Sequence, residues 1–371
     1  MPLYLTEDQV MLRETARELM AQEGSIANQL RKYRDMGCKD GFGHSLWRQM
    51  AELGFTGLRM DEADGGLGLG HVEAGIVLEE IGRNLTPSPF LISAVAVVEA
   101  LKGTPHAQRW FPGILAGETV AALAVDEGGK HRPETIAMRA ERAGNGFRLS
   151  GRKQFVVQGV SAEMIVVAAR SDEGVTLFAV ERDAKGLDVE GVRLADSSIG
   201  ARLDFREVEV DADAVIGEVG GGEAVLGRVL NAGRAGAASE MVGVASGAMA
   251  MTVDYLRQRK QFGKLIGEFQ ALQHRAAHLY SELEIARAAA LKAQQLLDEG
   301  SGEAEAMASV AKAKAGRVST LAVQEGVQMH GGIGMTDEYD IGLYMKRDRV
   351  LNELFGDPNY HADKLARMRG Y

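Results

Sequence analysis

The chain has 371 residues, with 42 basic and 52 acidic side chains, so its formal net charge is −10, and no run of Lys or Arg is long enough to make a basic face. Nucleic acid and anionic membranes are therefore poor partners, and the length predicts two or three folding units around a sizeable core. Cys38 is the only cysteine, which excludes an intrachain disulfide and is typical of a cytoplasmic protein.

We expect neither a signal peptide nor a membrane span. The first eight residues contain no basic stretch followed by an apolar one, and nowhere do about 18 uncharged apolar residues run together. The predicted location is cytoplasmic.

The first part of the chain, residues 1–118, is predicted to be a helical domain. Thr6 and Gln9 make a capping-box pattern before a helix, because a Thr side chain and a Gln three residues later satisfy each other's backbone N–H groups. Further helices are predicted over 46–53 and 72–82. Between them lies a glycine-rich stretch, 61–70, which is interpreted as a connecting loop because no strand precedes it and no Lys-Ser/Thr follows it.

The middle part, residues 119–221, changes to short β-branched runs between turn signals and is predicted to be an antiparallel β-barrel or sandwich. Asn145-Gly146 indicates a hairpin, since a type I′ turn needs positive φ at both central residues. The predicted strands cover residues 135–142, 147–151, 154–157, 164–169, 175–180 and 203–210.

The last part, residues 222–371, is predicted to be a four-helix bundle. Its clearest pattern is a run of apolar residues at alternating steps of four and three, which is typical of the buried seam of a long helix. The seam consists of Leu272, Ala276, Leu279, Leu283, Ala286, Ala290, Ala293 and Leu297. Ala and Gly residues over 235–250 would let neighbouring helices approach closely.

Three ordered motifs then point to a family. Residues 62–70 with 78–82 form one, the Arg-x-x-Phe-Gly…Phe-Gln stretch within 255–270 forms the second, and the Gln-x-x-Gly-Gly-x-Gly loop at 328–334 forms the third. Together they resemble the acyl-CoA dehydrogenase superfamily. The resemblance implies that superfamily's fold: a helical N-terminal domain, a β domain and a C-terminal helical bundle.

The resemblance also implies FAD as cofactor. In the family, the second and third motifs reach across a dimer interface and hold the ADP half of FAD in the neighbouring subunit. A guanidinium group is a planar partner for a diphosphate, and paired glycines let backbone N–H groups approach an anion. The residues implied for FAD binding are Arg259, Phe262, Gln270, Gln328, Gly331 and Gly332, with Phe155 and Val157 facing the flavin.

The chain departs from the family where the catalytic carboxylate belongs. The base position falls on Gly356, and a second position used by some members falls on Gly233. Members similar to the small subunit of pimeloyl-CoA dehydrogenase share Leu-Phe-Gly-Asp at 354–357. Asp357 is the best in-chain substitute for the base, Glu353 lies about one helical turn earlier, and a cap before Pro358 is the alternative role for Asp357.

The flavin-facing segments depart too. The family's Thr-Glu-Pro stretch is replaced by Val125-Asp126-Glu127, and its Trp-x-Thr segment by Phe155-Val156-Val157. Val157 has no hydroxyl group to offer a flavin. His330 and His361 have no second ligand at a useful offset, so we predict no metal site and assign both to packing or surface roles.

The predicted function is FAD-dependent dehydrogenation of an acyl-CoA thioester to the 2-enoyl-CoA. Two alternatives stay open: a non-catalytic subunit that completes a partner's FAD site, and a flavin oxidase or monooxygenase acting on a non-CoA substrate. By family resemblance, we expect an electron-transfer flavoprotein or similar acceptor. The expected assembly is a homodimer, a homotetramer, or a heterotetramer with a second acyl-CoA dehydrogenase subunit.

Overall fold

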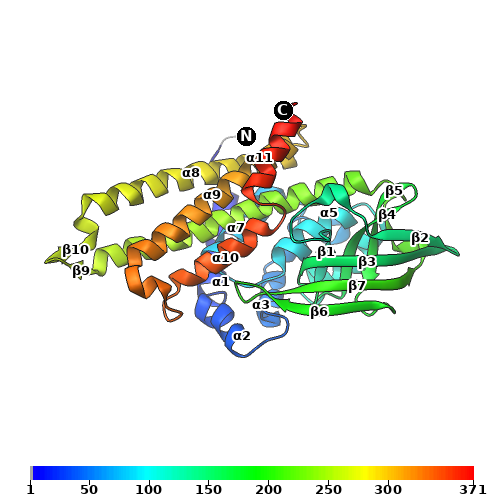
Figure 1. Cartoon of the computed structure of the whole chain (residues 1–371), viewed down its shortest axis with the longest axis horizontal. Coiled ribbons are helices and arrows are strands. Elements are labelled where there is room, and N and C mark those ends of the chain that lie inside the picture. The colour runs from blue at the N-terminus through cyan, green and yellow to red at the C-terminus, as the bar shows by residue number, and fades with distance from the viewer. Residues whose placement is uncertain (1–2) are drawn as a thin grey trace. The chain divides into compact units, whose positions relative to one another are not determined.

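The computed structural model describes residues 3–371 (Figure 1). The chain forms two compact units, each built from separate stretches. The first comprises the chain up to Arg31, His71–Thr86 and Arg234–Tyr371, and the second comprises Lys32–Gly70 and Pro87–Gly233. The domain boundaries expected near residues 118 and 221 stay a prediction.

The first unit is helical. Helix α1 begins at the predicted capping box: the Thr6 side chain accepts from Gln9 N, and the Gln9 side chain accepts from Thr6 N. The unit contains α1 (Glu7–Gln22), α4 (His71–Arg83), the part of α7 (Gly222–Gln258) after Gly233, α8 (Gln270–Asp298), α9 (Ala304–His330), α10 (Ile341–Glu353) and α11 (Pro358–Met368), with the short strands β9 (Lys260–Gln261) and β10 (Lys264–Leu265).

The predicted seam of α8 is confirmed. Its central members are buried, and its two ends are partly buried. Helix α9 packs against α8, α10 and α11, so it is the central helix of this bundle (Figure 1). The buried members of the seam are Leu279, Leu283, Ala286, Ala290 and Ala293.

Glycines set the close contact between α4 and α7. A methyl group added at Gly243 would lie 2.0 Å from the carbonyl oxygen of Glu79, and one added at Gly82 would lie 2.0 Å from that of Glu240. Neither position can carry a side chain, because the backbones of the two helices touch there. The close approach predicted for residues 235–250 is therefore present.

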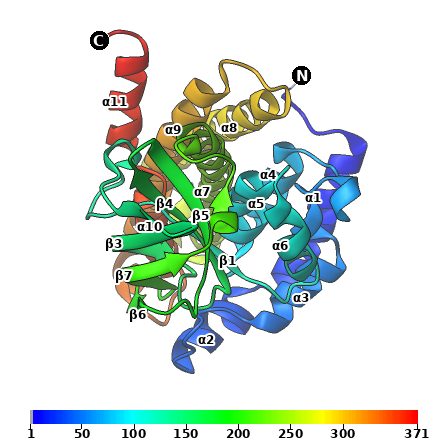
Figure 2. The same ribbon diagram turned by 90° about the vertical axis from the view of Figure 1, so that its right-hand side faces the viewer.

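The second unit is built on one mixed sheet, in the order β6-β7-β3-β2-β4-β5-β8, with β1 pairing with β4 (Figure 2). The strands are β1 (Ala121–Ala124), β2 (Arg139–Ala143), β3 (Gly146–Val157), β4 (Met164–Ser171), β5 (Gly174–Glu181), β6 (Leu187–Arg193), β7 (Ile199–Val210) and β8 (Val215–Ile216). Its α-helices are α2 (Lys32–Asp35), α3 (His44–Glu52), α5 (Val97–Leu101) and α6 (Pro105–Leu115), together with the part of α7 up to Gly233.

Most pairings in the sheet are antiparallel as predicted, but β4 pairs in parallel with both β1 and β2. The predicted strands 147–151 and 154–157 are one strand, β3, which contains two register shifts. The turn before it was misplaced by one residue. Ala143 pairs with Gly146, so the central turn residues are Gly144 and Asn145, and positive φ occurs at Gly144 (+58°) but not at Asn145 or Gly146. One glycine at the first turn position is enough for this hairpin, and a type I′ turn is not required.

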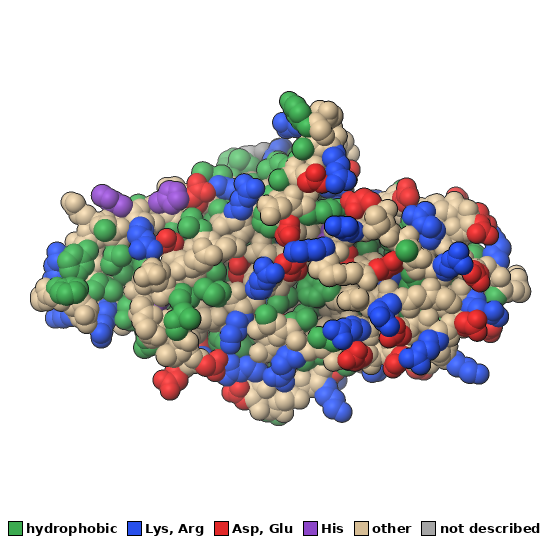
Figure 3. All heavy atoms as spheres, in the orientation of Figure 1, with side chains coloured by type: hydrophobic (Ala, Val, Ile, Leu, Met, Phe, Trp, Pro, Cys, Tyr) green, Lys and Arg blue, Asp and Glu red, His purple; other side chains and the backbone are tan. Residues whose placement is uncertain are grey.

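No helix within residues 3–371 is both long and apolar enough to cross a membrane. On the face shown in Figure 3, basic and acidic side chains are interspersed rather than separated.

Candidate functional site

One end of the helical unit brings together the sequence motifs implied for FAD. Leu256 at the end of α7, Ile266 after β10 and Met329 at the end of α9 form a small buried cluster, against which Tyr255 and Phe269 pack. Because this cluster joins three segments that are distant in the chain, the predicted residues around it share one end of the bundle. All six are exposed: Arg259, Phe262, Gln270, Gln328, Gly331 and Gly332.

The β9–β10 hairpin presents an aromatic and basic tip. Phe262 is 89% exposed and has a φ of +53°, and its ring lies 6.3 Å from that of Phe269. The Lys264 ammonium group lies 4.2 Å from the centre of the Phe269 ring. Apolar and basic side chains gather at this end of the molecule (Figure 3). Exposing a phenyl ring to water is unfavourable, and a positive φ adds backbone strain for a residue with a side chain. Both features indicate a surface that a partner or a ligand covers.

The glycine turn after α9 is open. Gly331 has a φ of +65°, and nothing lies within 4 Å of a methyl group added at either Gly331 or Gly332. Backbone groups of this turn can therefore be approached closely by a ligand. These residues fit the diphosphate and adenosine end of FAD, since Arg259 is exposed on the same end of the bundle.

His330 belongs to an aromatic stack beneath that turn. Its ring lies 4.4 Å from Tyr255 and 4.9 Å from Tyr339, and its Nδ1 is 2.6 Å from the carbonyl oxygen of Gly326. Burial lowers the pKa of His330. His361 is also fully buried, with its Nε2 3.1 Å from the carbonyl oxygen of Phe355. Among the described residues, no group of three or more His, Cys, Asp or Glu could hold a metal ion.

The two residues predicted to face the flavin lie in the other unit, on β3. Phe155 has a φ of +55° and lies within a register shift between Lys153 and Val156, while Val157 is buried and pairs with Gly200. A bulge that holds a non-glycine residue in the left-handed region is a common way to direct a side chain at a binding site.

A buried ion pair fixes the loop next to this bulge. Lys153 is completely buried, and its ammonium group lies 2.8 Å from Glu127 and 2.9 Å from the carbonyl oxygen of Val125. Glu127 also accepts from the backbone N–H groups of Ala137 and Met138. Burial alone would raise the pKa of Glu127, but the Lys153 ammonium group and these N–H donors hold it below its ordinary value. Sequence analysis did not identify this pair.

The same loop lines a cavity of about 400 Å³. Its walls include Glu127, Gly128, Gly129, Lys130 and Arg132. A methyl group added at either glycine would meet nothing within 4 Å. The segment that replaces the family's Thr-Glu-Pro stretch is therefore open, and it carries both acidic and basic side chains.

The position of the family's base has a defined geometry. Gly356 is buried with a φ of +103°, and the Asp357 carboxylate accepts from Asn359 N at 3.0 Å and Tyr360 N at 2.8 Å. Asp357 is therefore the N-cap of α11. Glu353 lies 2.8 Å from Arg349, one turn earlier on α10.

Lys312 holds the segment that contains Gly356. It is completely buried in α9, and its ammonium group donates to the carbonyl oxygens of Leu351 and Gly356, both at 2.9 Å, and of Asn352 at 3.4 Å. Burial lowers the pKa of Lys312 to about 7, although nearby Asp348 and Asp357 oppose the shift. Sequence analysis missed this residue. The available signal was a lysine on the buried face of α9, between Ala308 and Ala315.

The glycine turn after α9 and the base position around Gly356 lie far apart in the helical unit. Lys312 and Gly331 are 19 residues apart along α9 and the turn that follows it, which corresponds to about 28 Å at the rise of an α-helix. Asp357 and the glycine turn therefore do not share one small site within this chain.

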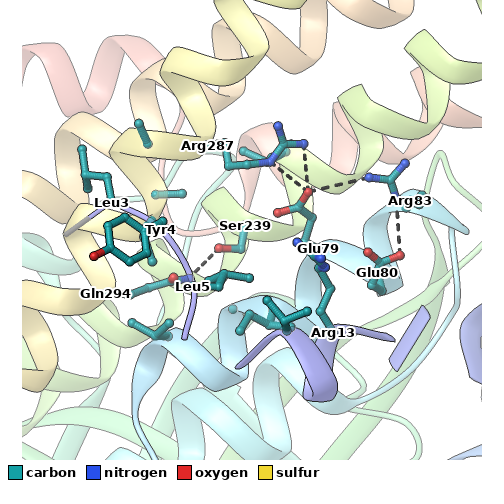
Figure 4. Close-up of a pocket in the computed structure, with 18 of the residues that line it drawn as sticks. Leu3, Tyr4, Leu5, Arg13, Glu79, Glu80, Arg83, Ser239, Arg287 and Gln294 are labelled. Carbon is teal, nitrogen blue, oxygen red and sulfur yellow. Dashed lines mark hydrogen bonds and ion pairs between the residues drawn. The ribbon is translucent and has the colours of Figure 1, made fainter. Parts of the chain in front are cut away.

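A third feature is a groove of about 600 Å³ between α1, α4, α7 and α8 (Figure 4). Its charged end is an ion-pair network: Glu80, only 1% exposed, lies 3.0 Å from Arg17, and Glu79 lies 3.0 Å from Arg287. Leu3, Tyr4 and Leu5 form its apolar end. Because the buried carboxylate of Glu80 is paired with Arg17 and Arg83, we interpret the network as a link between helices rather than a ligand site.

Comparison with known proteins identifies the family. Models of the N-terminal, middle and C-terminal domains of acyl-CoA dehydrogenase match residues 6–118, 122–211 and 220–369, so the chain belongs to the acyl-CoA dehydrogenase family of flavoprotein oxidoreductases.

Two curated relatives illustrate the match. Acyl-CoA dehydrogenase FadE12 of Mycobacterium tuberculosis is 32% identical over 337 residues, which are 86% of this chain and 86% of that protein. The short/branched chain specific acyl-CoA dehydrogenase of Bos taurus is 27% identical over 390 residues, covering 99% of this chain and 87% of that protein.

Solved structures share the fold. A variant of the Tcur3481-Tcur3483 steroid ACAD is 29% identical, with a TM-score of 0.90 over 98% of both chains. The ChsE4-ChsE5 complex of Mycobacterium tuberculosis has the same fold, with a TM-score of 0.91 over 100% of both chains at 24% identity.

Proposed function

We propose that this chain is a subunit of an FAD-dependent acyl-CoA dehydrogenase assembly that oxidises an acyl-CoA thioester to its 2-enoyl form. The observation that carries the proposal is the exposed, open glycine turn at the same end of the bundle as the exposed Arg259 and Phe262. The family models match residues 6–118, 122–211 and 220–369 of this chain.

Each group of residues has a role in this proposal. Arg259, Gln328 and the Gly331–Gly332 turn bind the diphosphate and adenosine end of FAD, and Phe262 and Gln270 cover it. Phe155 and Val157 flank the flavin ring from β3. When bound, FAD supplies the hydride acceptor for the β-hydrogen of the substrate, and an electron-transfer flavoprotein or similar acceptor reoxidises it.

The proton acceptor is the open part of the proposal. Asp357 is the in-chain candidate, displaced by one residue from the family position. Asp357→Asn tests it in the assembled protein, because the amide oxygen keeps the cap while losing the basicity. A loss of turnover with flavin absorbance and melting temperature unchanged supports Asp357 as the base. Unchanged turnover removes it from the mechanism.

A second function is favoured by one observation: Oδ1 of Asp357 accepts hydrogen bonds from two backbone N–H groups at the start of α11, so this carboxylate acts as a helix cap. In this reading the chain is a non-catalytic subunit that completes a partner's FAD site, and the partner carries its own carboxylate. Two of the solved relatives bear paired names, Tcur3481-Tcur3483 and ChsE4-ChsE5. This supports a heteromeric assembly here.

The two functions are separated by purifying this chain alone and together with the product of a neighbouring gene that carries the catalytic carboxylate. Flavin absorbance, mass and anaerobic reduction by acyl-CoA are measured together on both preparations. Tight FAD binding and reduction by this chain alone contradict the non-catalytic role. The absence of flavin from both preparations contradicts the proposed function as a whole.

A further inference from the structure

Gly356 lies where no side chain can be added without displacing a neighbour. A methyl group at its Cα would be 2.4 Å from Cδ1 and 3.0 Å from Cε1 of Tyr360, and 3.1 Å from Nε2 of His361. Non-bonded carbon atoms pack at about 3.5–4.0 Å. The Tyr360 ring therefore occupies the space that any side chain at position 356 would need.

The backbone on one side of this contact is held firmly. Lys312 donates to the carbonyl oxygens of Leu351 and Gly356, and His361 Nε2 lies 3.1 Å from that of Phe355. Phe355 itself has a φ of +60°, which a phenylalanine adopts only when its surroundings impose it. The loop cannot shift away from Tyr360 without breaking these hydrogen bonds.

The ring on the other side is held as well. Tyr360 N donates to the Asp357 carboxylate at 2.8 Å, and the ring packs edge-on against His361 at 5.1 Å. Its hydroxyl oxygen accepts from Nη2 of Arg234 at 3.3 Å. Arg234 is only 1% exposed and directly follows Gly233, the second position where the family places a carboxylate. The phenol therefore extends from Gly356 to the residue next to Gly233.

We propose that Tyr360 closes the base position of this chain, so that an acidic side chain at 356 can enter only when Tyr360 is made smaller. The meaning of the closure rests on the proposed function, since position 356 matters because the family keeps its base there. The steric claim stands on the contacts alone. Gly356 and Tyr360 are therefore a matched pair. The Tyr360 ring fits because position 356 has no side chain, and the ring fills the space that a side chain there would need.

A double-mutant cycle tests the closure. Gly356→Ala is made in the wild-type, Tyr360→Ala and Tyr360→Phe backgrounds of the full chain, and melting temperatures are measured. The positive φ at position 356 penalises alanine equally in all three, so a difference between backgrounds reports the ring alone. Gly356→Ala is expected to lower the melting temperature by at least about 2 °C more beside Tyr or Phe than beside Ala.

Equal losses in the three backgrounds overturn the proposal. If Gly356→Ala yields folded protein only together with Tyr360→Ala, that result supports the proposal as strongly as the expected difference in melting temperature. Tyr360→Phe is the matched control, because it removes the hydrogen bond from Arg234 and keeps the ring. A coupling that disappears in the Phe background would assign the effect to that hydrogen bond and contradict a steric closure.

Proton exchange gives an activity readout that a purely structural role would not change. In the assembled protein, Gly356→Glu is compared with Gly356→Glu/Tyr360→Ala for deuterium uptake at the α-carbon of saturated acyl-CoA thioesters from butyryl to palmitoyl. A carboxylate that takes the α-proton leaves an enolate, which then receives a deuteron from D2O.

At least tenfold faster exchange in the double variant than in the single one supports the closure. Fast exchange in Gly356→Glu alone overturns it, and so does the absence of any difference between the two. Flavin absorbance is recorded on the same samples. Protein without flavin counts against the proposed function, whereas the melting cycle, which needs neither flavin nor substrate, still decides the closure.

Discussion

The ammonium group of Lys312 lies 2.9 Å from the carbonyl oxygen of Gly356, so a fully buried cation in α9 holds the loop at the family's base position. The hydrogen bonds described for this ammonium group all go to backbone carbonyl oxygens, and none of them goes to a carboxylate. Removing Lys312 would leave buried carbonyl oxygens without a donor. The residue therefore shapes the loop rather than taking part in an exposed ion pair.

The stability of the protein is expected to depend on the titration of Lys312. Its pKa in the folded chain, about 7, lies below the ordinary value of 10.5, so the folded state releases this proton first. Between these two values the unfolded chain binds more protons, and the free energy of unfolding rises with pH. The contribution is at most about 1.4 kcal/mol per pH unit.

Lys312→Met should remove this contribution. Urea unfolding between about pH 6 and pH 9 is expected to show wild-type stability increasing relative to the variant as pH rises. Lys314→Met, two residues away and paired with Glu282, is the control and should keep the wild-type slope. Parallel profiles for wild type and Lys312→Met would show that Lys312 does not titrate in this range.

The Asp357 cap gives a prediction about stability that is separate from catalysis. Asp357→Ala removes the acceptor for two N–H groups at the start of α11, and we expect a loss of about 1 kcal/mol. Asp357→Asn should lose at most a few tenths. Thermal unfolding of both variants checks this, and equal stability of wild type and Asp357→Ala would show that the cap contributes nothing.

The architecture was predictable because its signals are local or periodic. The capping box of Thr6 and Gln9 and the α8 seam around Leu283 follow from residues within a few turns of one another. Three strands gave weaker signals. β1 is Ala-Ala-Leu-Ala, a composition with low strand preference, and β6 is a largely exposed strand at the edge of the sheet. β8 has only two residues.

The base position was only partly predictable for a different reason. The sequence shows that Gly356 lacks a side chain, but the ring that fills the space comes from Tyr360 on the next helix, and the cation that fixes the loop comes from Lys312 in α9. Such contacts depend on tertiary packing, and no sequence period encodes them. The same holds for Lys153 and Glu127, which lie 26 residues apart.

The Lys153–Glu127 pair should be among the most sensitive points of the sheet unit. Glu127→Ala would remove the only anionic hydrogen-bond partner described for the buried Lys153 ammonium group, which would keep just the carbonyl oxygen of Val125, and two backbone N–H groups would lose their acceptor. We expect a loss of about 3 kcal/mol at neutral pH. Because the pKa of Glu127 is lowered by folding, its contribution is present above about 4.5, its ordinary value, and is lost as pH falls further.

Urea unfolding at neutral and acidic pH measures both effects. Glu141→Ala is the matched control, because Glu141 pairs with Arg139 on an exposed face of β2 and its loss should cost at most about 0.5 kcal/mol. A similar small loss for Glu127→Ala would mean that the loop 126–138 is not held by this ion pair.

The glycine turn allows FAD binding to be separated from folding. Gly332 has no positive φ and nothing within 4 Å of an added methyl group, so Gly332→Ala should fold with an unchanged melting temperature. If the adenosine end of FAD approaches this turn closely, the methyl group blocks it, and we expect FAD affinity to fall at least tenfold in the assembled protein. Flavin titration and thermal unfolding on the same preparation measure the two effects.

Gly302→Ala is the control for that experiment, since Gly302 also has an open surrounding and no positive φ but lies in the loop between α8 and α9. It should change neither property. Arg259→Gln should lower FAD affinity in the same way as Gly332→Ala, because it removes the cation proposed to face the diphosphate. Wild-type flavin affinity in both Gly332→Ala and Arg259→Gln would contradict the placement of FAD at this end of the bundle, because neither the turn nor the guanidinium group would then contact it.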